Sequence, residues 1–265
     1  MENAKFYKWA NSFSGCDGGN KDAPIWVSGI EWGLGKEKGQ SDQDYEKYLK
    51  KYYQNDLPQA IDNGNTEISS IYDWKEQLKF GFGIVLAKLY SVIKGFDIDS
   101  YKNPEIFNGN ELFKLNLYPI AFPNTKPETY LDFWEKYKLE RITGFHDNEN
   151  YRIWCFYNRF PIFNKILKSN GSSKLIICTG IDYLLDFYSA FITDKSSSKI
   201  YIEKIKTTSK NGNTFYKKYY WTLDKKNLIV VVPFFTGRNG LNSNEIIVNL
   251  GTRIKNILDS YNIIL

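Results

Sequence analysis

The chain has 265 residues with a net charge of +5, and 17% of its residues are aromatic. This length is enough for one large α/β domain with a sizeable core, so we expect a single domain over residues 1–265. The mild positive charge is compatible with a polyanionic partner and equally with a lysine-rich solvated surface. Three unevenly spaced cysteines and a single histidine argue against a disulfide framework, a zinc site and a histidine-based metal cluster, so we expect no metal and no cofactor.

The first residues are polar and aromatic and lack the apolar core of a signal peptide. No apolar run approaches the length of a membrane span. We therefore expect a cytoplasmic protein that does not contact membranes. The oligomeric state stays open at this stage.

Short apolar runs alternate with helical patterns along the chain. The runs predict strands at residues 25–28, 112–117, 174–179 and 228–232. The helical patterns fall at residues 42–53, 72–94, 151–168, 182–192 and 243–261. The alternation predicts an α/β fold with three α/β/α layers and a central, mainly parallel sheet of about four strands.

Residues 199–223 differ in character from the rest of the chain. Two strand-like runs flank Asn211-Gly212-Asn213, which predicts a β-hairpin inserted at the sheet edge. Lysines and tyrosines alternate along this hairpin. Such a pattern suits contact with single-stranded or distorted DNA, and it also suits an ordinary hairpin with one solvated face.

Two strands far apart in the sequence end in Gly-rich polar loops. The first loop is Gly29-Ile30-Glu31-Trp32-Gly33, and the second runs from Phe234 to Asn242. Loops at the carboxyl ends of parallel strands lie together in open α/β sheets, and ligands bind there. The two loops therefore predict one composite site.

Taken in chain order, the four strand ends resemble those of the uracil-DNA glycosylase superfamily. They read Gly29-Ile30-Glu31-Trp32-Gly33, Leu115-Asn116-Leu117-Tyr118-Pro119, Cys178-Thr179-Gly180 and the loop 234–242. The single-strand-selective monofunctional type is the most similar branch. Its asparagine strand has a Cys-Pro-Leu exit, similar to Tyr118-Pro119-Ile120, and its last loop has a Pro-Arg-Asn sequence, similar to Gly237-Arg238-Asn239. The resemblance runs from about residue 26 to the C-terminus, without the hairpin.

The resemblance implies roles for individual residues. Glu31 takes the place of the catalytic Asp or Asn, which stabilises the sugar cation and orients water. Asn116 would read the edge of a flipped base. Arg238 is the other catalytic candidate, because it could compensate for a missing family histidine by donating to the leaving base. The remaining candidates for substrate binding are Gly29, Trp32, Phe82, Tyr118, Phe234, Thr236 and Asn239.

Each role has a structural alternative. Asn116 could satisfy local backbone groups, Glu31 could be an exposed loop carboxylate, and Phe82 and Trp32 could be core aromatics. The sequence also departs from the family pattern. Trp32 replaces a motif proline, and Phe234 stands where the family has the histidine that stabilises the base anion. His146 lies in the wrong part of the chain to replace it, whereas Arg238 or Thr236 could.

The resemblance implies a monofunctional glycosylase that flips a modified or damaged base out of DNA and hydrolyses its N-glycosidic bond without a metal. Its partner would be DNA, either single-stranded or a duplex with a flipped base. One alternative is a glycosylase-fold protein that binds nucleic acid or a nucleotide without catalysis. Another is an unrelated α/β enzyme acting on nucleotides or sugar phosphates, which distant placement of Glu31 and Asn116 would favour.

Overall fold

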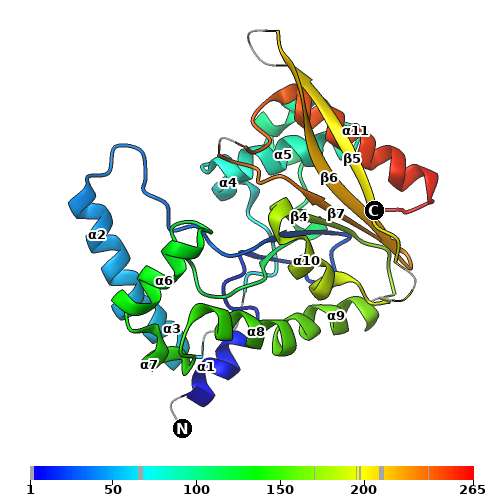
Figure 1. Cartoon of the computed structure of the whole chain (residues 1–265). Helices are drawn as coiled ribbons and strands as arrows, with labels where there is room; N and C mark the ends of the chain where they lie inside the picture. Colours follow the sequence, from blue (N-terminus) through cyan, green and yellow to red (C-terminus); the bar gives the residue numbers. More distant parts are fainter. Residues whose placement is uncertain are drawn as a thin grey trace.

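The computed structural model describes residues 3–64, 68–169, 171–194, 196, 198–208, 212–237 and 239–265. A seven-stranded sheet with helices on both faces forms the centre of the fold (Figure 1). Its strands are β1 (Gly18–Gly19), β2 (Ile25–Gly29), β3 (Leu112–Asn116), β4 (Leu175–Thr179), β5 (Tyr201–Thr208), β6 (Thr214–Asp224) and β7 (Asn227–Val232). They are ordered β1-β3-β2-β4-β7-β6-β5 across the sheet.

The central strands β3, β2, β4 and β7 are all parallel. Every residue of these four strands is buried, which explains their near-continuous apolar sequence. The predicted α/β class is confirmed. The prediction of about four strands is too low, because antiparallel strands extend both edges and make the sheet mixed.

One extension is the pair Gly18–Gly19, which runs antiparallel to β3 and which the sequence did not predict. The other is the predicted hairpin, formed by β5 and β6. Because β6 also pairs with β7, the hairpin continues the main sheet. Asn211, part of the predicted turn, lies outside the described residues.

Helices cover both faces of the sheet. On one face lie α1 (Asn3–Ala10), α2 (Asp42–Lys51), α3 (Leu57–Asp62), α6 (Pro127–Lys136), α7 (Leu139–Thr143), α8 (Asn148–Asn158), α9 (Phe160–Ser169) and α10 (Leu184–Phe191). On the other lie α4 (Trp74–Gln77), α5 (Gly81–Ile93) and α11 (Asn244–Ser260). Single turns occur at Tyr52–Asp56, Ile98–Lys102, Pro104–Ile106, Gly109–Glu111 and Ile181–Tyr183.

The predicted helices differ from the observed ones mainly where the chain bends. The segment 72–94 is two helices, and the backbone of Gly83 packs so closely on the carbonyl of Gln77 that no side chain fits between them. The segment 151–168 also divides, between Asn158 and Phe160, because Pro161 has no amide hydrogen to continue the helical hydrogen bonds. The start of α11 is as predicted, since the Ser243 hydroxyl accepts a hydrogen bond from the amide of Ile246. Within the described residues, no helix is both long and apolar enough to span a membrane.

Candidate functional site at the carboxyl edge of the sheet

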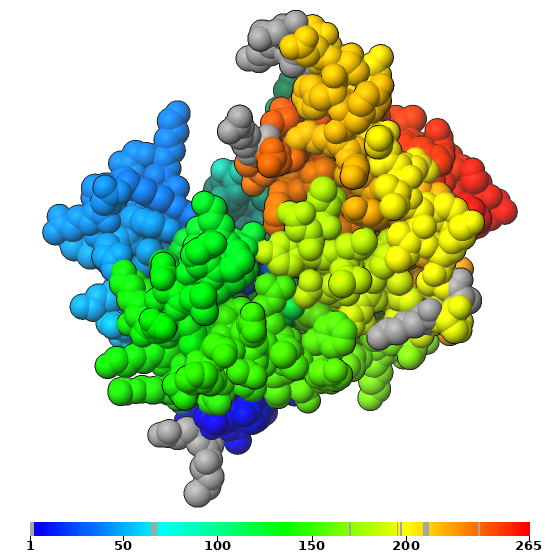
Figure 2. All heavy atoms as spheres, in the orientation of Figure 1, coloured from blue at the N-terminus to red at the C-terminus, as the bar shows by residue number. Residues whose placement is uncertain are grey.

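The loops that follow β2 and β3 continue side by side beyond the strands. The amide of Tyr118 donates to the carbonyl of Ile30 at 2.8 Å, and the amide of Phe122 donates to the carbonyl of Trp32 at 3.1 Å. This pairing brings two of the predicted motifs together at the carboxyl edge. Figure 2 shows the molecular surface hollowed between the blue lobe around α2 and the orange segment that follows β7.

Glu31 is partly buried and its carboxylate points toward α6. The hydroxyl of Tyr130 donates to Glu31 Oε1 at 2.9 Å. Burial raises the pKa of Glu31 to about 8, although the Tyr130 hydrogen bond and the charge of Arg152 both lower it. Glu31 is therefore largely protonated at neutral pH and titrates in the range where a general acid or base works best.

Arg152, from α8, lies beside Glu31 inside a group of aromatic rings. Its guanidinium carbon is 4.5 Å from the ring centre of Tyr118 and 5.3 Å from that of Tyr183. Its Nη2 donates to Asp186 Oδ1 at 3.2 Å, and the hydroxyl of Tyr118 donates to the same carboxylate oxygen. We call Glu31, Tyr118, Tyr130, Arg152, Tyr183 and Asp186 the Glu31 cluster.

Asn116 lies at the end of β3 and faces the opposite side of the sheet. Its side chain is 2% exposed, and its Nδ2 donates to the carbonyl of Gly15 at 2.7 Å. Its Oδ1 and the backbone carbonyl oxygen of Glu31 both lie within 4 Å of the point that a Cβ on Gly29 would occupy. The backbones of Glu31 and Asn116 are therefore close, but their side chains point to opposite sides of the sheet, so an unrelated α/β enzyme remains an alternative.

Trp32 and Phe82 belong to a chain of contacts on the Asn116 side. The indole Nε1 of Trp32 donates to Asp17 Oδ2 at 3.1 Å, and Asp17 pairs with Lys114 at 2.6 Å. The ammonium of Lys114 is 4.4 Å from the ring centre of Phe82. Trp32 keeps 45% of its surface exposed, so an aromatic face is available to a ligand here.

Phe234 follows β7 and packs on the end of β4. Its ring occupies the place that a side chain on Gly180 would need, and Gly180 has a φ of +120°. The ring also makes an edge contact with Tyr183, with centres 6.4 Å apart. The position that the resemblance to uracil-DNA glycosylases aligns with a histidine is thus held by an apolar ring next to the Glu31 cluster.

Thr236 borders a cavity of about 300 Å³ between α5 and the start of α11. The cavity is mainly apolar, and its lining includes Ile84, Val85, Phe235, Leu241 and Ile247. Asn239 is exposed beside it, and Lys217 of the hairpin donates to the carbonyl of Gly240 at 2.6 Å. Arg238 lies outside the described residues.

The predicted site residues thus form two groups, one on each side of the strand ends. Glu31 and Tyr118 lie with the Glu31 cluster. Gly29 and Asn116, which touch each other, and Trp32 and Phe82, which Asp17 and Lys114 connect, lie on the α5 side, where Thr236 borders its cavity. A ligand that contacts both groups has to cross the carboxyl ends of β2 and β3.

The sequence analysis missed Tyr130, Arg152 and Asp186, which come from three helices whose patterns carry no sign of a site. Lys114 did leave a signal, because it is the one charged residue in the apolar run Leu112–Leu117. A lysine on a strand buried on both faces needs a partner, which Asp17 provides.

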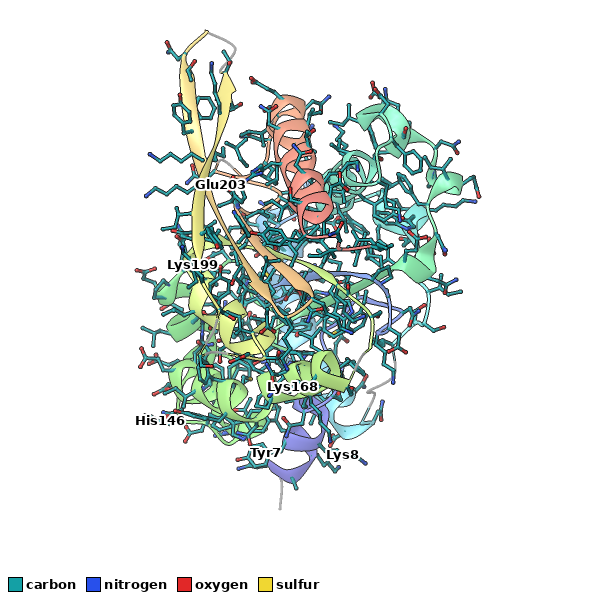
Figure 3. The ribbon with its side chains drawn as sticks, turned by 90° about the vertical axis from the view of Figure 1, so that its right-hand side faces the viewer. Tyr7, Lys8, His146, Lys168, Lys199 and Glu203 are labelled. Atoms are coloured by element: carbon teal, nitrogen blue, oxygen red, sulfur yellow. The ribbon has the colours of Figure 1, made fainter. Side chains whose placement is uncertain are left out.

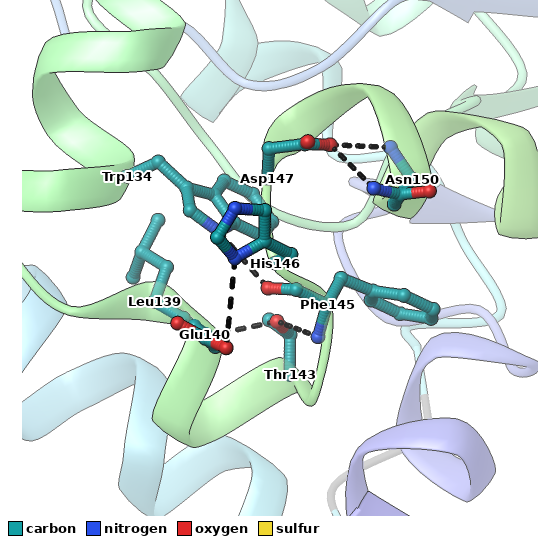
Figure 4. Close-up of polar contacts among 8 residues, drawn as sticks. All are labelled: Trp134, Leu139, Glu140, Thr143, Phe145, His146, Asp147 and Asn150. Atoms are coloured by element: carbon teal, nitrogen blue, oxygen red, sulfur yellow. Dashed lines mark hydrogen bonds and ion pairs between the residues drawn. The ribbon is translucent and has the colours of Figure 1, made fainter.

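The single histidine is a surface residue. His146 is 82% exposed, between α7 and α8, and its Nδ1 is 3.8 Å from Glu140 Oε1 (Figure 4). It borders a cavity of about 560 Å³ together with Trp134 and Arg141. Neighbouring Asp147 caps α8 by accepting from the amide of Asn150, so this region has a structural role.

Comparison with protein-family models, with curated proteins and with solved structures finds no match to this chain.

Proposed function

We propose that this protein is a DNA glycosylase-like hydrolase that excises a modified or damaged base by hydrolysing its N-glycosidic bond. The observation that carries the proposal is Glu31, a carboxyl with a pKa of about 8 at the carboxyl edge of parallel strands. Across the strand ends, on the other side of the sheet, lie the exposed ring of Trp32 and the amide of Asn116, which is the candidate for reading a base.

Glu31 suits the role of a proton donor. As the bond between base and sugar breaks, its electron pair moves to the base, and protonated Glu31 supplies the proton that neutralises the leaving base. Water then attacks the sugar cation and returns a proton to the Glu31 carboxylate. The reaction consumes one water, releases the free base and an abasic sugar, and leaves Glu31 as it began.

This assignment addresses the missing histidine. Phe234 has no donor for a base anion, whereas a protonated carboxyl can donate one hydrogen bond or transfer its proton. The Glu31 cluster also supplies the cation Arg152, which favours negative charge nearby. A base anion formed here has a donor without any histidine.

A second candidate is a glycosylase-like protein that binds nucleic acid without catalysis. The hydrogen bond from Asn116 to the carbonyl of Gly15 favours it, because this amide already satisfies a backbone group. To read a base, Asn116 would use its Oδ1 and its second amide hydrogen. Alternatively, its amide would break the hydrogen bond to the Gly15 carbonyl and donate to the base instead.

An abasic-site assay separates the two candidates. Single- and double-stranded oligonucleotides carrying uracil, 5-hydroxymethyluracil, hypoxanthine, mismatched thymine or modified cytosine are incubated with protein and cleaved with alkali. We expect excision of one base by the wild type, loss of excision in Glu31→Gln and Asn116→Ala, and no change in Glu140→Gln, which removes an exposed glutamate.

Excision that survives Glu31→Gln would refute the role of Glu31. DNA binding without excision of any base in the panel would favour the binding-only candidate. Failure of both excision and binding would remove the nucleic-acid assignment for these substrates.

A further inference from the structure

The distal half of the β5–β6 hairpin projects beyond the sheet at the same edge as the candidate site. β6 pairs with β7 from Asp224 to Tyr220, where Tyr220 lies opposite Val231. β7 ends one residue later, at Val232, whereas β6 extends back to Thr214 and pairs there only with β5. The distal hairpin therefore continues past the carboxyl ends of the parallel strands, as Figure 1 shows.

One face of the hairpin is anchored on α11. Glu203 of β5 accepts hydrogen bonds from the Tyr219 hydroxyl, from Trp221 Nε1 at 2.8 Å and from Arg253 Nε at 2.8 Å. Nearer the tip, the amide of Thr208 donates to Glu245 Oε2 at 2.8 Å. These contacts fix the direction in which the hairpin projects.

The other face carries positive charge and aromatic surface. Side chains alternate between faces along a strand, and cross-strand partners share a face. The register therefore places together Ile202 with Tyr220, Lys204 with Lys218, and Lys206 with Tyr216. We call these six residues the basic face.

The lysines of the basic face have no counterions among the described residues. Lys204, Lys206 and Lys218 are exposed, and no ion pair or hydrogen bond joins their ammonium groups to a described residue; the backbone carbonyl of Lys206 accepts from Asn249 Nδ2 at 3.2 Å. The described acidic residues of the hairpin point elsewhere: Glu203 binds Arg253, and buried Asp224 accepts from Thr193. Lys204 and Lys218 are direct cross-strand neighbours, an arrangement of like charges that destabilises an isolated hairpin.

We propose that the basic face binds the phosphate backbone of a single-stranded nucleic acid and leads it to the carboxyl edge of the sheet. This inference rests on the proposed function, because that function makes nucleic acid the substrate. An anion between Lys204 and Lys218 relieves their repulsion, and Tyr216, 60% exposed, offers a ring for stacking on a base. A flat β face with separated lysines and aromatic rings fits a flexible polyanionic chain.

The test is a binding titration with a fluorescently labelled single-stranded oligonucleotide at several salt concentrations. Lys204→Glu/Lys218→Glu is compared with Lys8→Glu/Lys168→Glu, which makes the same change in net charge. Figure 3 shows Lys8 and Lys168 toward the opposite end of the molecule from Glu203 of the hairpin. We expect the hairpin variant to lose about tenfold or more in affinity. The slope of its log association constant against log salt concentration should be smaller in magnitude by about 1.4, because two phosphate contacts are lost. The control should bind nearly as the wild type does.

Lys204→Glu alone separates binding from folding. It replaces a like-charge pair by an attractive one, so the hairpin becomes more stable while binding weakens. Equal losses in the hairpin and control variants would overturn the inference, because net charge alone would then explain binding. Binding of the wild type to phosphatidylserine vesicles, but not to oligonucleotide, would also overturn it.

The result is independent of catalysis. If the basic face binds DNA but no base is excised, the inference stands and the glycosylase proposal fails. If excision requires Glu31 while the hairpin variant binds and reacts as wild type does, the glycosylase proposal stands and the inference fails.

Discussion

The amide oxygen of Asn116 fills the space that a side chain on Gly29 would need. The two residues are register partners at the ends of the parallel strands β3 and β2, so their contact sets how closely the two motif loops approach. Any side chain on Gly29 has to push the Asn116 amide away from this position.

Gly29→Ala is therefore expected to impair the site. The added methyl group forces Asn116 aside, and overpacking of this kind costs roughly 1–3 kcal/mol of stability. Gly33→Ala is the matched control, because a Cβ at Gly33 meets no atom within 4 Å. We expect excision or DNA binding to fall in Gly29→Ala and to persist in Gly33→Ala, measured by activity and thermal melting. Equal behaviour of the two variants would show that the Asn116 position is unimportant.

The pKa of Glu31 predicts the pH dependence of activity. If protonated Glu31 donates to the leaving base, the excision rate falls as pH rises through about 8. Glu31→Gln removes the proton and should lower the rate roughly 10²- to 10⁴-fold. Tyr130→Phe removes a hydrogen bond that lowers this pKa, so the alkaline limb of the pH–rate profile should move to higher pH. A profile that Tyr130→Phe leaves unmoved would argue against Glu31 as the titrating group.

The same raised pKa predicts an effect on stability. The folded state holds the Glu31 proton more tightly than the unfolded chain, whose carboxyl has a pKa of 4.5, so stability declines as pH rises from 4.5 to about 8. Glu31→Gln should remove this decline and raise the free energy of unfolding at pH 8 by roughly 4 kcal/mol. Urea denaturation of the wild type and Glu31→Gln at pH 4 and pH 8 measures this difference in free energy of unfolding. A difference of equal size at both pH values would contradict the raised pKa of Glu31.

Arg159 should be essential for folding. It is fully buried and donates to the carbonyls of Ala10, Ser14 and Leu117, which ties the N-terminal segment to the end of β3. Arg159→Met leaves these acceptors without partners and should cost roughly 3–5 kcal/mol. Exposed Arg141→Met should change stability by less than about 0.5 kcal/mol. Similar urea midpoints for the two variants would disprove this role.

Glu203 should stabilise the hairpin, with a dependence on pH opposite to that of Glu31. Arg253, Tyr219 and Trp221 hold its pKa at about 2, so its contribution is present above pH 4.5 and is lost as pH falls toward 2. Glu203→Gln should cost roughly 1–3 kcal/mol at neutral pH. Glu105→Gln, which breaks only an exposed pair with Lys75, should cost less than about 1 kcal/mol. Thermal melting at pH 3 and pH 7 measures the stability loss in both variants. The loss in Glu203→Gln should be smaller at pH 3 than at pH 7, so the two variants should differ less there.

Local patterns in the sequence predicted much of the fold. The runs at 25–28 and 228–232 read as buried strands because both faces of the central sheet are covered, and Ser243 marked the start of α11. The pair Gly18–Gly19 could not be predicted, because two glycines become a strand only where β3 offers a free edge. The break between α8 and α9 falls just before Pro161, a local signal that the helical pattern of residues 151–168 masks.

The sequence by itself determined the α/β class, the parallel strands and the placing of Glu31 and Asn116 at strand ends, because hydrophobic periodicity and glycine loops are local properties. Only the tertiary structure decided the directions of their side chains. The Glu31 carboxyl turns toward Tyr130, while the Asn116 amide turns toward Gly15 on the opposite side of the sheet. The pKa of Glu31 was likewise decided by burial among side chains from separate helices, which no single stretch of sequence records.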